Sequence, residues 1–289
     1  MKRMLYVAMA VLLLSGCRKD PREQERPLYP TVGAINARYS VGDSTTVVFA
    51  QGNLQYQPSS RRWRFASNQY DVIGYRNALA DTTSSEWIDL FGWGTSGYGS
   101  LMPYCLSDSL QDYHCIGSTL AGSPYDWGLF NAIDNGGDKA GQWRTLTYGE
   151  WHYLLYERDS AAAKQSLATL TNTDGQGAAV RGLLLLPDKW SMPAGCSFQY
   201  DTVPPYSFGL NTYSPSQFNK MQSAGAVFLP AGGYRDSATV AMVGDYGCYW
   251  TASGYTDDSA YELYMDDTRY ALYPTARHIG HSVRLVQEK

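Results

Sequence analysis

The side chains best suited to chemistry are concentrated in one segment near the end of the chain, residues 249–286. This segment is dense in Tyr, Asp, Ser, Thr, Arg and His. Tyr rings provide stacking surfaces, and charged side chains orient a ligand through hydrogen bonds. The segment predicts noncovalent recognition, the alternative being solvated loop side chains. The predicted ligand-binding residues are Tyr255, Asp257, Asp258, Tyr261, Asp266, Asp267, Tyr270, Tyr273, Arg277, His278 and His281.

Catalytic motifs do not accompany this segment. The sequence contains no GxSxG, HExxH, phosphate-loop or EF-hand spacing, so we predict neither enzymatic activity nor catalytic residues. Clustered oxygens in "NAIDNGGD" and "YMDDT" are compatible with calcium, which is a hard cation. Asp-Asn-Gly clusters are also typical of plain turns. Apart from this calcium alternative, no metal and no cofactor is predicted.

Four cysteines follow the first seventeen residues: Cys105, Cys115, Cys196 and Cys248. In an oxidising compartment an even number predicts up to two disulfides, with three pairings open. The short stretch "CLSDSLQDYHC" favours a Cys105–Cys115 bridge, and Cys196–Cys248 then follows by elimination. A single His beside Cys115 is too little for a structural zinc site, which needs four spaced ligands.

The charge and the residue composition of the chain limit the kinds of molecule that it is expected to bind. The 289 residues carry a formal net charge of -4, so the chain lacks the basic footprint of a nucleic-acid-binding protein. The chain has 24 Tyr, 8 Trp and 28 Gly but only 17% charged residues. Such a composition favours short strands, turns and Tyr-rich contact surfaces. Most of the Trp residues are predicted to fill the core.

The start of the chain predicts export and lipid anchoring. "MKRMLYVAMAVLLLSGC" has a basic start and an apolar run too short to cross a bilayer, as in a secretory signal. "LLSGC" resembles the bacterial lipobox, which makes residues 1–16 the signal peptide and Cys17 the lipidated anchor in a bilayer; the alternative is an ordinary signal with an incidental Cys. The charged, Pro-containing stretch that follows predicts a disordered tether over 17–40 and a folded domain over 41–289.

Coarse patterns predict an α+β domain. Alternation in "TTVVFAQGNLQYQ" and "RRWRFA" predicts a hairpin, and capping residues predict two helices, one from Thr147 and one from Ser214 to Gly225. In the first helix, Trp151, Leu154, Leu155 and Arg158 share a face. Short strands are predicted at 183–187, 226–230, 248–253, 260–265 and 281–287.

Several stretches carry a family resemblance: "VFAQGNLQYQ", "WRFASNQYDVIG", "WIDLFGWGTSGY", "DWGLFNAIDNGG", "WRTLTYGEW", "GLLLLPDKW", "AGAVFLPAGGYR", "GCYWTAS" and "GHSVRLV". Together they resemble Bacteroides-type surface lipoproteins of the major paralogous domain family, which are similar to C-type-lectin-like and formylglycine-generating-enzyme-like proteins. The resemblance implies an outer-membrane location and a single, loop-rich C-type-lectin-like domain with two main helices. It also implies antiparallel strands, adjoining terminal strands, and Val283 and Leu285 on one core-facing side.

In this family fold, the segment before the last strand displays a binding surface, and diversity-generating retroelements rewrite it in some relatives. An Asn codon changed only at its adenines never encodes Glu, Lys, Gln, Met or Trp. Between Gly254 and His281 only Glu262 and Met265 belong to that set, so the segment is compatible with diversification. A fixed Tyr-rich binding surface has the same composition for physical reasons alone.

The function predicted from the sequence is noncovalent binding of a glycan or protein ligand by a lipid-anchored surface protein. Two alternatives stay open. One is a structural or fimbria-associated envelope component. The other is a divergent formylglycine-generating-enzyme-like enzyme, although only Cys248 lies where such relatives carry a redox-active pair.

Overall fold

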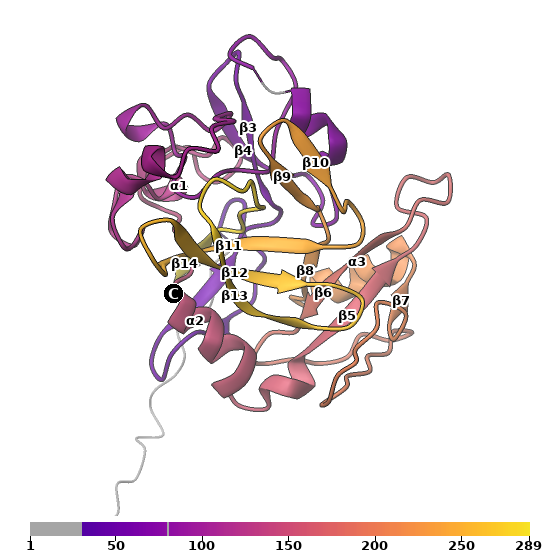
Figure 1. Ribbon diagram of the computed structural model, residues 1–289. Helices are drawn as coiled ribbons and strands as arrows, with labels where there is room; N and C mark the ends of the chain where they lie inside the picture. Colours follow the sequence, from indigo (N-terminus) through magenta and orange to yellow (C-terminus); the bar gives the residue numbers. More distant parts are fainter. Residues whose placement is uncertain (1–30, 80) are drawn as a thin grey trace, which may run out of the picture.

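The computed structural model describes residues 31–79 and 81–289, and its fold is α+β, with small, mostly antiparallel sheets and few helices (Figure 1). The predicted signal peptide and Cys17 lie outside the described residues. Within the described part of the chain, no helix is both long and apolar enough to span a membrane.

The strands are short. Their bounds are β1 (Tyr39–Ser40), β2 (Thr46–Phe49), β3 (Leu54–Gln57), β4 (Arg62–Phe65), β5 (Gln165–Leu170), β6 (Val180–Leu185), β7 (Thr212–Tyr213), β8 (Val227–Pro230), β9 (Tyr234–Asp236), β10 (Thr239–Ala241), β11 (Gly247–Gly254), β12 (Ser259–Met265), β13 (Tyr270–Ala276) and β14 (Val286–Glu288).

The α-helices are α1 (Trp127–Phe130), α2 (Tyr148–His152) and α3 (Pro215–Ser223). A single π-helical turn, η4 (Tyr153–Glu157), continues α2. The remaining helical segments are 3-10 turns: η1 (Gly74–Leu79), η2 (Tyr98–Ser100), η3 (Leu110–Ile116) and η5 (Ala161–Lys164).

Strands from the two ends of the chain lie side by side, as the family resemblance implies. The sheet β1-β2-β14 pairs Val286 with Phe49 in antiparallel register. The extended segment before β14 is buried, and Val283 and Leu285 belong to one hydrophobic cluster. The predicted scaffold role of these two residues is confirmed.

The predicted hairpin and both predicted helices are also present. Antiparallel β3 and β4 pair from Leu54–Phe65 to Gln57–Arg62. Thr147 and Glu150 form a reciprocal capping box at α2, and Ser214 and Gln217 form one at α3. Each box satisfies backbone N–H groups that have no partner in the first turn of a helix. One pairing departs from the antiparallel expectation, because β5 runs parallel to β7 in the sheet β7-β5-β6-β8.

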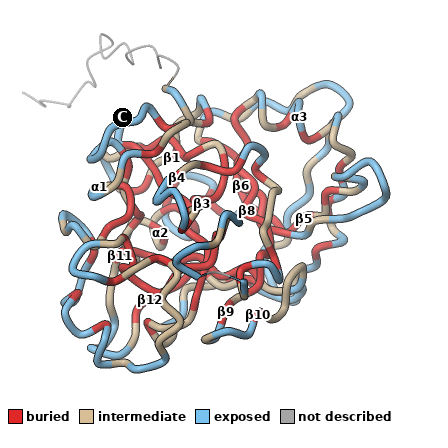
Figure 2. The backbone as a smooth tube through the Cα atoms, turned by 90° about the horizontal axis from the view of Figure 1, so that it is seen from above, coloured by how far each residue is buried: buried red, intermediate tan, exposed pale blue. Residues whose placement is uncertain are grey.

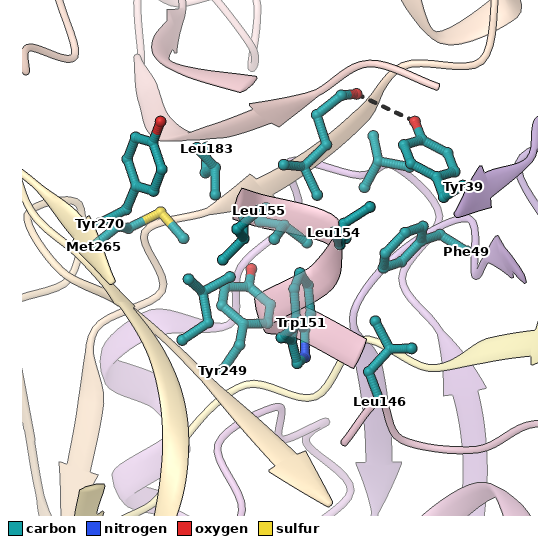
Figure 3. Packing of buried hydrophobic residues seen from close by; sticks show 14 of the residues in the cluster. Tyr39, Phe49, Leu146, Trp151, Leu154, Leu155, Leu183, Tyr249, Met265 and Tyr270 are labelled. Atoms are coloured by element: carbon teal, nitrogen blue, oxygen red, sulfur yellow. Dashed lines mark hydrogen bonds between the residues drawn. The ribbon is translucent and has the colours of Figure 1, made fainter. Parts of the chain in front are cut away.

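The core is built largely from aromatic side chains, and buried backbone runs through the middle of the molecule (Figure 2). Figure 3 shows Phe49 of β2 and Leu146 on one side of Trp151 of α2 and Tyr249 on the other, and Met265 belongs to the same cluster. A second cluster contains Trp63, Trp93, Trp127, Trp143 and Trp250, so the predicted core role of most Trp residues is confirmed.

The folded domain begins earlier than predicted. Ile35 donates its backbone N–H to the Phe49 carbonyl, and Tyr39 of β1 is fully buried. The Tyr39 hydroxyl donates to the carbonyls of Leu185 and Gly225, at 3.2 and 2.6 Å. The predicted end of the tether at residue 40 is therefore wrong, because an aromatic residue in that stretch completes the core.

The core and the surface are expected to respond differently to substitution. Val283→Asp places a charge without a partner at a position with 0% exposure, and we expect it to lower the free energy of unfolding by about 4 kcal/mol or more. Val203→Asp, at 71% exposure, is the matched control, and Tyr273→Ala, at 40%, is expected to cost less than about 1 kcal/mol. Denaturant unfolding followed by circular dichroism measures all three. Equal losses of unfolding free energy in the three variants would contradict the assignment of Val283 to the core and of Val203 and Tyr273 to the surface.

Candidate functional site

The Tyr-rich segment folds into a sheet and a returning extended segment; the strands predicted at 248–253 and 260–265 are present in β11 and β12. Strands β11, β12 and β13 form an antiparallel sheet in that order, with α2 beside it (Figure 1). The chain then returns beside β11, where the Ser282 N–H donates to the Cys248 carbonyl. β13 was not predicted as a strand. It is an edge strand, the position in a sheet where Pro274 is tolerated.

Eight of the predicted ligand-binding residues have exposed or half-buried positions. The exposed ones are Tyr255, Asp257, Asp258, Asp267 and Tyr273, and the half-buried ones are Tyr261, Asp266 and His278. They occupy the two turns of the sheet, the outer positions of β12 and β13, and the turn after β13.

Three of the predicted residues are buried, so the prediction that they face solvent is wrong. Tyr270 is 7% exposed, because it lies opposite Met265 and packs into the main core (Figure 3). Arg277 and His281 are 1% and 2% exposed. Their polar side chains make contacts inside the protein that the sequence alone did not reveal.

Arg277 holds the loop between β11 and β12 in place. Its guanidinium donates to the carbonyls of Thr256, Ser259 and Tyr113, at 2.6, 3.3 and 3.1 Å. It also lies 4.4 Å from the centre of the Trp93 ring. Burial lowers the pKa of Arg277, and the carboxylates of the loop oppose this effect. Arg277 is therefore a positioning residue for the loop that carries Tyr255, Asp257 and Asp258.

A row of aromatic rings runs from this loop across α2. The ring centres of Tyr255 and Tyr261 are 5.2 Å apart, and those of Tyr261 and Tyr148 are 4.3 Å apart. The row continues from Tyr148 to His152 at 5.9 Å and from His152 to Tyr156 at 5.1 Å. These five rings form the first half of what we call the aromatic band.

Helix geometry explains the α2 part of the row. Residues four apart lie on the same face of a helix, and Tyr148, His152 and Tyr156 have this spacing. The capping box fixes the first turn, and Trp151, Leu154 and Leu155 bury the opposite face. The spacing of these three rings was a signal available in the sequence, although it was not recognised there.

The second half of the aromatic band lies on the face of the β12–β13 hairpin that points away from the main core, the outer face, whereas Tyr261, three residues from Tyr264, lies on the other face of β12. The Tyr264 ring lies 5.3 Å from that of Tyr246 and 6.1 Å from that of Tyr273. The Arg269 guanidinium lies 5.6 and 5.7 Å from the Tyr264 and Tyr273 ring centres. The Tyr264 hydroxyl donates to Asp266 at 2.9 Å. A cation, a carboxylate and three rings thus share one face.

The charge state of Asp266 is fixed locally. Partial burial raises its pKa, but hydrogen bonds from the Thr268 hydroxyl and N–H outweigh burial and hold the pKa below its usual range. Burial, together with the hydrogen bond to Asp266, raises the pKa of Tyr264. At neutral pH the outer face therefore presents the Asp266 carboxylate and the Arg269 guanidinium beside the neutral Tyr264 phenol.

A pocket of about 370 Å³ beside Arg144 and Glu288 is a less suitable ligand site, because its charged groups already pair with each other. Its charged lining residues, Arg144 and Glu288, face each other at 3.9 Å, and Arg144 also forms a bidentate pair with Glu150. A pocket of about 430 Å³ adjoins the band. It is lined by Pro204, Pro205, Tyr206, Thr268, Arg269, Tyr270, Ala271 and Tyr273.

The four described cysteines are free, so the predicted disulfides are wrong. The Cys105 sulfur accepts from the Tyr113 hydroxyl at 3.9 Å, and Cys196 contacts the Gln217 carbonyl at 3.5 Å. Cys248 is buried beside Glu262 and His281. Burial raises the pKa of the Cys248 thiol, and a buried protonated thiol is a poor nucleophile, so its position does not favour the enzyme alternative.

The two segments considered for calcium use their oxygens within the protein. Asp134 pairs with Arg62 at 2.7 Å, and Asn135 exchanges hydrogen bonds with the Phe65 backbone. Asp266 accepts from Thr268, and Asp267 accepts from the Phe208 N–H at 2.9 Å. These contacts are those of turn and scaffold residues.

Comparison with known proteins provides no relative for this chain: no family model, no curated protein and no solved structure matches it. The site is therefore defined by its own geometry.

Arg277 is expected to control the order of the neighbouring loop. Arg277→Ala removes three buried hydrogen bonds, and we expect a loss of about 3 kcal/mol in the free energy of unfolding. Amide hydrogen exchange is expected to accelerate most over residues 255–259. Arg62→Ala is the control, because Arg62 is a largely exposed partner of Asp134 and its loss is expected to cost less than about 1 kcal/mol. Unchanged exchange in the loop of Arg277→Ala would contradict the positioning role.

Proposed function

We propose that this protein binds a carbohydrate chain noncovalently on the aromatic band. The band consists of Tyr148, His152, Tyr156, Tyr246, Tyr255, Tyr261, Tyr264 and Tyr273. The observation that carries the proposal is the presence of two rows of ring contacts, one from Tyr255 to Tyr156 and one from Tyr246 to Tyr273, each of which provides stacking platforms for a repeating ligand. The pocket lined by Tyr206 and Tyr273 accommodates one bulky unit beside the band.

Polar groups beside the rings support the same ligand class. Asp266 and Arg269 lie at the centre of the outer face, and His152 contacts Glu157 at 2.8 Å at its α2 end. Hydroxyl-rich ligands both donate and accept hydrogen bonds, so carboxylates and guanidinium groups beside a ring orient them. Ligand sites commonly combine aromatic side chains with a few polar groups that fix the orientation of the ligand, and this surface contains both.

The edge of the sheet makes recognition by strand addition a poor alternative. Strand addition uses the backbone N–H and C=O groups of an edge strand. The edge strand here is β13, and Pro274 removes one N–H from its middle. Recognition through side chains therefore fits this sheet better than pairing with a peptide strand.

The fold and location that we propose follow the family resemblance. The pairing of β2 with β14 and the mixture of small sheets with two capped helices support a C-type-lectin-like domain. Lipid anchoring at Cys17 in the bacterial outer membrane would place this domain at the cell surface.

Glycan binding is expected to depend on the band. Tyr148→Ala and Tyr261→Ala each remove one partner of the closest ring contact, and we expect each to weaken binding about tenfold, or about 1.4 kcal/mol. A glycan array with the intact protein selects the ligand, and titration calorimetry measures the variants. Tyr98→Ala is the control, since Tyr98 is 41% exposed in a separate cluster with Tyr125 and Phe130. A missing array signal, or equal loss in the control, would overturn the proposal.

Lipid anchoring is tested separately. Cells expressing the full chain are labelled with palmitate, and we expect incorporation that Cys17→Ser abolishes. Cys115→Ser is the matched control, because Cys115 is an exposed cysteine of the folded domain, and its loss is expected to leave labelling unchanged. Labelling that persists in Cys17→Ser would contradict the anchor.

A further inference from the structure

Three potential metal ligands meet on the face of the sheet that also carries Tyr264 and Tyr273. Cys248 comes from β11, Glu262 from β12 and His281 from the segment that returns beside β11. The sulfur, one carboxylate oxygen and one ring nitrogen lie within 4.8 Å of one another, and all three residues are buried. Within residues 31–79 and 81–289, no other group of His, Cys, Asp and Glu meets these criteria.

Three buried polar atoms of this cluster have no hydrogen-bond partner. Glu262 Oε2 and both ring nitrogens of His281 are buried without a hydrogen bond to any described residue. A buried polar atom without a partner costs about 1–3 kcal/mol, and three such atoms at one point in a native core call for a physical explanation.

An ion pair does not supply that explanation. His281 Nε2 and Glu262 Oε2 are 3.1 Å apart. The two atoms nevertheless form no hydrogen bond with each other, so this contact leaves both without a partner. Imidazole nitrogens are common metal ligands.

The set of donor atoms matches zinc. Zinc is bound by Cys sulfur, His nitrogen and carboxylate oxygen; structural sites use four protein ligands, and sites with three protein ligands hold a water or another small ligand at the fourth position. Bond lengths of about 2.0–2.3 Å place neighbouring ligands of a tetrahedron about 3–4 Å apart, close to the observed 3.1 Å between His281 and Glu262. The Trp250 ring, centred 4.4 Å from that of His281, fixes the orientation of the imidazole.

We propose that Cys248 Sγ, Glu262 Oε2 and a ring nitrogen of His281 bind one zinc ion. Binding converts the thiol to a thiolate and releases its proton, because a coordinating thiol is deprotonated by the cation. The ion neutralises the thiolate and carboxylate in the core and gives partners to two of the three unpartnered atoms, Glu262 Oε2 and one ring nitrogen of His281.

The zinc ion would connect three segments beside Tyr264 and Tyr273 of the aromatic band. Cys248 is the direct cross-strand partner of Tyr264, and Glu262 is that of Tyr273. Directly opposed residues share a face of the sheet, so the metal would lie on the same side as these two rings. This site is independent of the ligand proposed above, because zinc binding requires no carbohydrate.

The test uses the untagged full chain, purified in detergent from cells grown in defined medium with zinc or with cobalt. Buried ligands are filled during folding, so the metal is supplied during expression. We expect one zinc per chain by mass spectrometry and, in the cobalt protein, a near-ultraviolet thiolate-to-cobalt absorption band. Cys248→Ser is expected to abolish the band, and His281→Asn to lower the metal content. Cys196→Ser, which changes a half-buried cysteine elsewhere, is expected to keep both.

A metal-free folded wild-type protein, a different native metal, or a band that survives in Cys248→Ser would overturn the proposal. Should the variants fail to fold, X-ray absorption at the zinc edge of the wild-type protein decides the outcome. A shell with one sulfur and the remaining ligands nitrogen or oxygen supports the assignment. A shell without sulfur overturns it.

Discussion

The buried guanidinium of Arg284 is the interaction on which the organisation of the fold depends. Its five hydrogen bonds all go to neutral oxygens: the side chain of Asn53, the backbone of Ala50 and Phe228, and both the side chain and the backbone of Gln69. Burial lowers the pKa of Arg284 to about 10, so the group stays charged at neutral pH. A buried charge is tolerated only when its hydrogen bonds are satisfied, so β2, β8 and the last extended segment must meet at this point.

Buried side chains that donate hydrogen bonds to backbone carbonyls also stabilise other irregular parts of the chain. Short strands leave many carbonyls without a ladder partner, and buried carbonyls need donors. Arg277 supplies donors beside the loop between β11 and β12, and Arg235 donates to the carbonyls of Leu90, Cys105 and Ser237. Trp side chains act likewise, since Trp93 donates to Thr251 and Trp250 to Phe91. The aromatic content predicted a filled core, but the indole N–H groups also hold loops in place.

Capping and alternation patterns in the sequence were reliable, whereas predictions of exposure that depend on distant partners were not. The capping residues at α2 and α3 and the alternation in β3 and β4 act over a few residues, so the sequence predicted these elements. The burial of Arg277 and His281 depends on segments more than 150 residues away, such as Tyr113 and Phe91. Polar residue types indicated exposure, whereas their partners decided burial. The strand β13 was missed because Pro274 and the Tyr residues suggested a loop.

The alternation of β12 explains how one hairpin serves both core and surface. Leu263 and Met265 face the main core, while Glu262 and Tyr264 face the other way. Glu262 and Met265, the two residues that changes at Asn-codon adenines cannot produce, are both buried. Diversification is thus compatible with the fold at exposed positions such as Tyr255 and Tyr273. It is incompatible with the buried positions Tyr270, Arg277 and His281, because substitution there removes core packing or the hydrogen bonds that hold the loop.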